Sequence, residues 1–275
     1  MTIAGRNRFL ILSICITALL TIGGIICCVI LITQNSIGEL PLPPKSSFWL
    51  MQQPFLSYSN YAAVIGTAAF PLMSAVILAY IFFLFEKTTA LEISFFSLFI
   101  FALSLEVVRL MFPLQAAYPL LTVVIAPIAR GLFFFRFSAY LSLLTASLFA
   151  HQTFTRETGS VIFLLSFISF SLAHTIPINT GRTLSFFLFT ETYRYLLYSF
   201  DGIICVLSVI SFLFIGIFRS IPEYYKAALW LLLLLAAYTA LLYAGSWLFT
   251  IAGIAGFLCG AFGFIRTLHQ FYLWQ

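Results

Sequence analysis

A few charged side chains lie inside stretches of sequence that are otherwise apolar, and their chemistry needs an explanation. Glu92, Glu106 and Arg109 occupy one such stretch, and Arg130 and Arg136 lie in the next. An ionised side chain in the hydrocarbon core of a membrane costs roughly 2.5–3.5 kcal/mol on insertion scales, so each should face a partner or a polar cavity. On a helix, Glu92 and Glu106 fall within about 40° of each other. Arg109 follows Glu106 by three residues, a spacing at which helical side chains pair.

The heights of these charges along the two helices predict which ones pair. In an antiparallel hairpin that turns near Gln115, Glu92 and Arg136 differ by roughly 4 Å in height. Glu106 and Arg130 differ by roughly 8 Å, so this second pair needs a helix kink. The sequence therefore predicts the ion pairs Glu92–Arg136 and Glu106–Arg130.

A second polar cluster precedes and enters the sixth apolar stretch, and His174 ends the fifth stretch on the same side. If the segment is helical, four residues share a stripe roughly 80° wide: Glu191, Arg194, Tyr198 and Asp201. The phenylalanines and tyrosines around this stripe predict an interfacial helix on the outer leaflet. The convergence predicts an outward-facing polar cavity for a small polar or ionic ligand, and ion pairs that only fix helix packing are the alternative. The candidate ligand-binding or ion-pairing residues are Glu92, Glu106, Arg109, Arg130, Arg136, His174, Glu191, Arg194 and Asp201.

No metal or catalytic motif accompanies these charges in the sequence. The three histidines lie on different segments and the five cysteines form no Cys-x-x-Cys pair, so neither a metal site nor a cofactor is expected. Glycine-rich nucleotide loops and nucleophile elbows are also missing from the sequence. A binding protein is therefore favoured over an enzyme.

Composition explains why so few charges stand out. The chain has 275 residues, of which 8% are charged and 63% hydrophobic, with a mean hydropathy of +1.11. Soluble domains carry about 25% charged residues, so a soluble enzyme, a coiled coil and a disordered chain are excluded. The basic residues never form a run, and the net charge of +5 is therefore not a sign of nucleic-acid binding. The partner that the composition predicts is the lipid bilayer.

Eight apolar stretches predict an all-α, polytopic transmembrane helix bundle of about eight membrane-spanning helices, because a span takes about 20 apolar residues. The whole chain, 1–275, is expected to be a single integral membrane domain with spans at 9–33, 61–85, 90–112, 118–150, 159–176, 201–218, 227–244 and 247–265. The first stretch is expected to be an uncleaved anchor. The stretch 118–150 could be one span or include a re-entrant half-helix, and a tight hairpin is expected at Gly245–Ser246. The proline-rich residues 34–60 are expected to form an extracytoplasmic loop.

Loop charges predict the orientation. Seven lysines and arginines fall on one side and three on the other, which favours cytoplasmic N- and C-termini in the cell (inner, cytoplasmic) membrane. In the last span, glycines spaced three, four and three apart form a stripe of small residues. Packing within the bundle is its expected role, and the alternative is a homo-oligomer through Gly253, Gly256, Gly260 and Gly263.

Three functions are compatible with these features. The leading one is a membrane sensor or binding module that signals through a membrane or cytoplasmic protein partner. A permease or channel component for a small solute or ion is the second, with the buried charges as its sites. A structural subunit of a membrane complex is the third.

Overall fold

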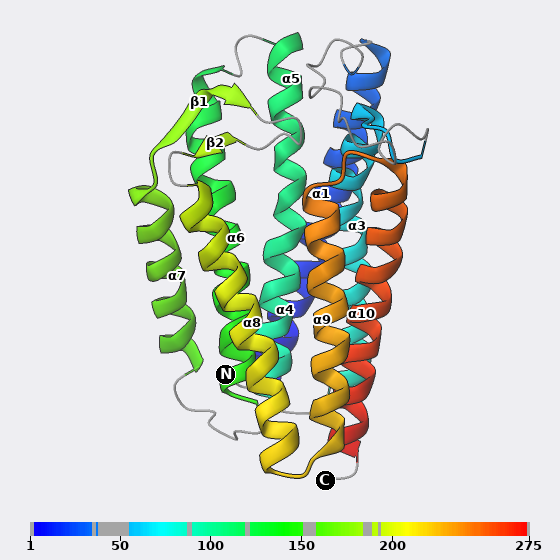
Figure 1. Ribbon diagram of the computed structural model, residues 1–275, viewed down its shortest axis with the longest axis vertical. Helices are drawn as coiled ribbons and strands as arrows, with labels where there is room; N and C mark the ends of the chain where they lie inside the picture. Colours follow the sequence, from blue (N-terminus) through cyan, green and yellow to red (C-terminus); the bar gives the residue numbers. More distant parts are fainter. Residues whose placement is uncertain are drawn as a thin grey trace.

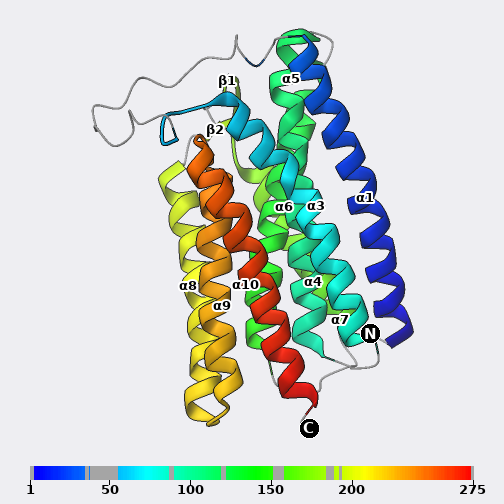
Figure 2. The same cartoon turned by 90° about the vertical axis from the view of Figure 1, so that its right-hand side faces the viewer.

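The computed structural model describes residues 3–34, 37, 55–86, 90–118, 122–150, 158–183, 189–191 and 194–273. Within these residues, eight helices are long and apolar enough to cross a membrane, so the chain is an all-α, multi-pass membrane protein. The first helix begins and the last helix ends at the same end of the bundle (Figures 1 and 2), as an even number of crossings requires. We call this end the basal end.

The predicted spans correspond to helices in the structure. In chain order the elements are α1 (Ile3–Thr33), α3 (Asn60–Phe85), α4 (Leu91–Ser104), η2 (Leu105–Leu110), α5 (Met111–Ala117), α6 (Thr122–Leu148), α7 (Thr158–Thr175), β1 (Ile178–Thr183), β2 (Phe189–Glu191), α8 (Arg194–Phe218), α9 (Pro222–Leu242) and α10 (Trp247–Leu273). Helix α4, the 3₁₀ turn η2 and α5 follow one another directly and form the third crossing. Helix α6 continues through Pro127 and is counted as one span, so the described part of 118–150 crosses once. The hairpin expected at Gly245–Ser246 is confirmed.

The interfacial helix predicted before the sixth span falls partly on 186–188 and 193, which lie outside the described residues, and its last residues, from Arg194 on, belong to α8. Strands β1 and β2 pair antiparallel, with Ile178 opposite Glu191, beside the start of α8 (Figure 1). We call this the hairpin end of the bundle. The prediction was wrong for Phe189–Glu191, because aromatic and β-branched residues favour strands as well as membrane interfaces. The extracytoplasmic loop predicted over 34–60 lies largely outside the described residues.

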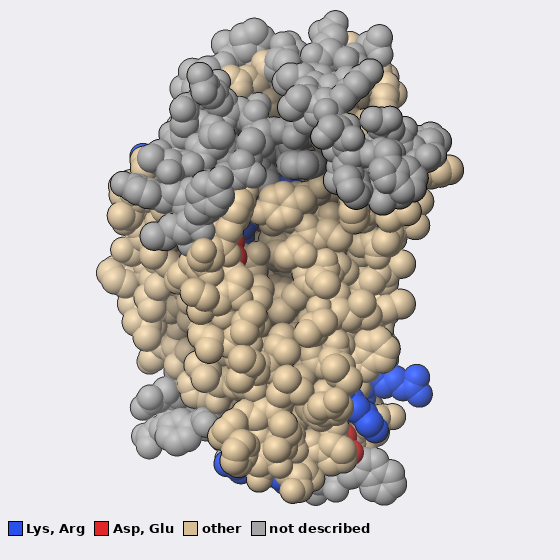
Figure 3. Space-filling model, in the orientation of Figure 1, with Lys and Arg blue, Asp and Glu red and all other residues tan. Residues whose placement is uncertain are grey.

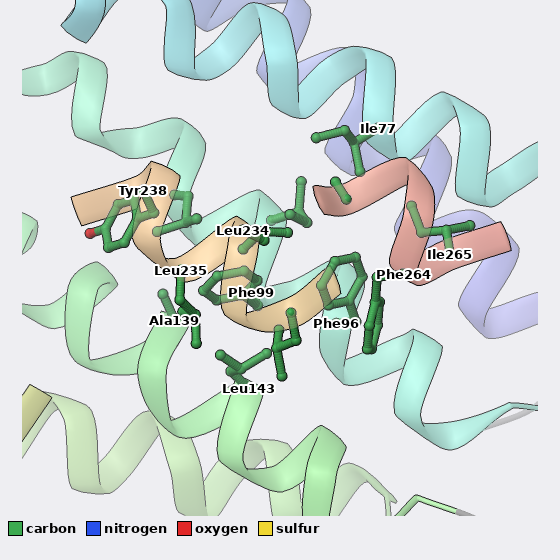
Figure 4. Close-up of a cluster of buried hydrophobic side chains, with 14 of the residues drawn as sticks. Ile77, Phe96, Phe99, Ala139, Leu143, Leu234, Leu235, Tyr238, Phe264 and Ile265 are labelled. Carbon is green, nitrogen blue, oxygen red and sulfur yellow. The ribbon is translucent and has the colours of Figure 1, made fainter. Parts of the chain in front are cut away.

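The most buried crossing is the third, which lies between α3, α6, α9 and α10. Figure 4 shows its contacts: Phe96 and Phe99 of α4 meet Leu143 of α6, Leu234 of α9 and Phe264 of α10. The rings of Phe96 and Phe264 lie 4.5 Å apart between centroids. This central helix carries three of the candidate charges, so the core of the bundle positions them.

Helices α9 and α10 pack closely along the predicted glycine stripe. A Cβ at Gly260 would lie 2.7 Å from the backbone nitrogen of Leu234, and one at Gly263 would lie 2.2 Å from the ring of Trp230. The packing role is therefore confirmed within the chain. Because α9 already covers this face, a homo-oligomer would require its displacement and stays an untested prediction for Gly253, Gly256, Gly260 and Gly263.

Arg6 joins α1 to the end of α3 at the basal end. Its side chain is 3% exposed, and Nη2 donates hydrogen bonds to the carbonyls of Phe85 and Glu86, the latter at 3.1 Å. The last carbonyls of a helix have no partner within the helix, so the arginine satisfies groups that would otherwise be orphaned. Arg6 is one of the seven basic residues whose position predicts the orientation of the chain, and the sequence does not indicate this second role.

Candidate functional site

Three of the candidate residues form a buried ion cluster. Arg136 makes a bidentate pair with Glu106, donating from Nε to Oε1 at 3.0 Å and from Nη2 to Oε2 at 3.1 Å. Nε of Arg109 lies 2.9 Å from Oε2 of the same carboxylate. The side chains of Glu106, Arg109 and Arg136 are only 2%, 1% and 6% exposed. One carboxylate thus faces two guanidinium groups, and the cluster carries a net charge of +1.

Helix α9 completes this cluster. The hydroxyl of Tyr238 donates a hydrogen bond to Oε1 of Glu106 at 3.3 Å, and Nη1 of Arg109 donates to the carbonyl of Leu242 at 3.1 Å. Charge-assisted bonds of this kind are the strong ones in a low-dielectric interior. The cluster therefore joins η2, α6 and α9.

Both ion pairs predicted from sequence were wrong. Glu106 pairs with Arg136, whereas Arg130 is exposed and forms no ion pair with any described residue. The connection between the two helices falls at 118–121, about four residues later than expected, which moves the level partner of Glu106 from about 125 to about 133. The 3₁₀ turn, with its rise of about 2.0 Å per residue, also changes the height of Glu106.

Glu92 belongs to a different site, at the basal end. Its carboxylate is fully buried, and Oε1 accepts hydrogen bonds from the hydroxyls of Tyr224 and Tyr272, each at 2.9 Å. Glu92 lies in the first turn of α4, where the helix dipole favours a negative charge. Its two partners come from α9 and α10, and no spacing in the sequence marks either tyrosine.

The remaining candidates lie on α7, β2 and α8. His174 is exposed near the end of α7, where its ring stacks on Phe170 at 5.9 Å. Glu191 ends β2, so it is not on the helical stripe, and Arg194 is the first residue of α8. Asp201 lies two turns into α8 and lines a cavity.

A cavity of about 760 Å³ lies between α8 and α9, with α6 behind it. Its end nearer the β-hairpin is polar and contains Asp201, Tyr198, Tyr243 and Tyr140. Apolar side chains line the rest, among them Val209, Ile210, Leu232 and Leu235. Asp201 is the one acidic residue among the described residues that line it.

The cavity exists because α8 and α9 diverge. Near their turn the helices are in close contact, since a Cβ at Gly216 would lie 2.8 Å from the backbone nitrogen of Tyr225. Toward the hairpin end they separate (Figure 1), and the space-filling view shows a hollow with acidic and basic atoms at its upper end (Figure 3). Val206, Ile210 and Leu232 line this hollow and are also 56%, 52% and 54% exposed. The cavity therefore opens sideways through the membrane-spanning surface, and we call it the α8–α9 groove.

Comparisons with known proteins supply no activity for this site. No family model matches the chain. The chain is similar to a protein of Treponema pallidum (strain Nichols) that is described as uncharacterized, with 27% identity over 345 aligned residues that cover all of both chains. That alignment is longer than this chain of 275 residues, so the relative carries insertions. No solved structure matches.

Proposed function

We propose that this protein is a membrane-embedded binding protein that acts as a sensor and takes its ligand in the α8–α9 groove. The observation that supports this proposal is the groove itself: a cavity of about 760 Å³ with Asp201 and tyrosines at one end and mainly apolar side chains along the rest. Small-molecule sites are typically of about 300–1,000 Å³, mostly apolar, with a few placed polar groups. The lining favours a ligand with an apolar body and a polar group, rather than a small free ion.

The excess of positive charge in the loops supports an orientation with the basal end in the cytoplasm of the cell membrane. In that orientation the polar end of the groove lies toward the outer face. A ligand would then be recognised in the outer half of the membrane, and the response would be read at the basal end.

Helix α9 supports a sensing role because it contacts three sites along its length. Leu232 and Leu235 line the groove, Tyr238 bonds Glu106, and Tyr224 bonds Glu92 at the basal end. A ligand that holds α8 away from α9 would bias the position of α9, and with it the bonds at both acidic residues. A ligand shifts such an equilibrium only through its different affinities for the two states.

A cavity-filling substitution tests whether the groove binds a ligand. Apart from the chain neighbours and the backbone of α8 itself, no atom lies within 4 Å of the place where a Cβ at Gly202 would stand, so Gly202→Leu adds a side chain at the groove with no contact at its Cβ. Gly23 on α1 has the same free space away from the groove, which makes Gly23→Leu the matched control. Native mass spectrometry of protein extracted from membranes should show a bound small molecule on the wild type and on Gly23→Leu, and should not on Gly202→Leu. Equal retention in all three proteins would contradict the proposal.

Transport and assembly measurements separate sensing from the alternatives. Protein-dependent flux of a solute in proteoliposomes would favour a permease or channel component. Co-purification in a fixed ratio with a non-signalling membrane complex would favour a structural subunit. The sensor proposal predicts neither result, and it predicts a signalling protein as the partner that co-purifies.

A further inference from the structure

The polar end of the α8–α9 groove combines one carboxylate with aromatic rings. Asp201 and Tyr140 lie in its wall, and the rings of Tyr198 and Tyr243 meet edge to face at 5.9 Å and 85°. A carboxylate supplies the opposite charge for an ammonium group, and aromatic faces attract it through the ring quadrupole. This end of the groove is therefore chemically suited to an ammonium group.

The charges around the groove favour a zwitterionic ligand over a simple cation. Among the described side chains at this depth, Glu106 is bound by Arg109 and Arg136, which leaves the buried ion cluster at +1. Asp201 lines the groove with a charge of the opposite sign, so both signs of charge lie beside this end of the groove. Net charge is costly in a low-dielectric environment, so a ligand with both an ammonium group and an anionic group is less costly to bind there than a simple cation.

The shape of the groove favours a ligand that arrives from the bilayer. Its lining runs along α8 from Tyr198 to Ile210, about 18 Å at 1.5 Å per residue. The hydrocarbon region of one leaflet is about 15 Å deep, half of the roughly 30 Å core. An acyl chain in that leaflet therefore matches the apolar part of the groove, and the lateral opening admits it.

We infer that the ligand is a zwitterionic phospholipid with an ammonium head group, such as a phosphatidylethanolamine. The ammonium group lies at Asp201 beside the rings of Tyr198 and Tyr243, and one acyl chain lies between α8 and α9. This inference rests on the proposed function and adds the chemical class of the ligand.

The test compares two lipids that differ only in the head group. Purified protein is titrated with phosphatidylethanolamine and with phosphatidylglycerol of identical acyl chains, and bound lipid is counted by native mass spectrometry. Wild type should prefer phosphatidylethanolamine by about 10-fold, which corresponds to about 1.4 kcal/mol. Asp201→Asn should reduce the preference to less than about 2-fold, whereas Asp201→Glu should retain most of it.

Further variants distinguish failure of the inference from failure of the proposed function. Tyr243→Leu should weaken the preference without removing the carboxylate, which gives a second measurement if Asp201→Asn does not fold. If both lipids bind equally and Gly202→Leu abolishes the binding of both, the head-group inference is overturned, but the groove remains a binding site. If hexadecylamine binds tightly and phosphatidylethanolamine does not displace it, the ligand is a free amphipathic amine, and the phospholipid assignment is overturned. Lipid binding that Gly202→Leu leaves unchanged would overturn the proposed function as well.

Discussion

Replacing Glu106 by glutamine should be among the most damaging single substitutions in the membrane-spanning part of the protein. It leaves Arg109 and Arg136, which are 1% and 6% exposed, without the carboxylate that neutralises them. Breaking a buried pair by removing one partner costs about 3–5 kcal/mol, because a charge stays buried without compensation. Arg136→Met should cost less, about 1.5–3 kcal/mol, because it leaves a neutral pair of Glu106 and Arg109 and loses only charge-assisted hydrogen bonds.

The assay is reversible unfolding in detergent micelles, with a double-mutant cycle over Glu106→Gln and Arg136→Met. The double variant should cost less than the sum of the single variants by about 1–3 kcal/mol, since it removes one of the two uncompensated cations. Arg130→Met is the control on the same helix and should change stability by less than about 0.5 kcal/mol, because Arg130 is exposed. Additive losses, or a Glu106→Gln cost no greater than that of Arg136→Met, would refute the charge argument.

Three further substitutions test the packing that surrounds the site. Gly260→Ala should lower the unfolding temperature, because its Cβ would lie 2.7 Å from a backbone nitrogen of α9. Gly23→Ala has free space and should leave the unfolding temperature unchanged or raise it. Equal shifts in the two variants would contradict the close packing of α9 and α10. Arg6→Met should destabilise the protein by about 1–3 kcal/mol by uncapping α3, and unchanged hydrogen exchange in the last turn of α3 would speak against that role. Tyr272→Phe removes a hydrogen bond to Glu92, so it should lower the free energy of unfolding by about 1 kcal/mol and speed up hydrogen exchange at the end of α10. If neither the stability nor the exchange rate changes, the bond does not stabilise the protein.

The number of membrane-spanning helices and their approximate positions could be predicted from the sequence, because a bilayer demands long apolar stretches. The ion pairs could not be predicted from the sequence, because pairing depends on the height of each residue along its helix. A turn at 118–121 and a 3₁₀ segment at 105–110 were enough to replace Arg130 by Arg136 as the partner of Glu106. Hydropathy does not report either feature. Glu106, Arg109 and Arg136 of the buried ion cluster could therefore be predicted as candidates, whereas the contact between Glu106 and Arg136 could not.

The α8–α9 groove could not be predicted from the sequence, although Asp201, one of its lining residues, could be chosen as a candidate. Asp201 was a candidate because a charge at a membrane segment needs a reason. Helix α8 begins at Arg194, seven residues before the expected start of that span, so Asp201 lies within the helix and on a cavity wall. The cavity results from the divergence of α8 from α9, and Tyr140, Tyr198 and Tyr243 reach it from α6, α8 and the end of α9. Single-sequence patterns contain no signal for such a meeting of distant residues.

Electron cryomicroscopy of the protein in lipid nanodiscs can show directly whether the α8–α9 groove is a binding site. If the groove binds a ligand, elongated density should lie between α8 and α9, with its polar end at Asp201, in the wild type and not in Gly202→Leu. Helices α8 and α9 packed together along their whole length, with protein side chains filling the space between them, would contradict the proposal.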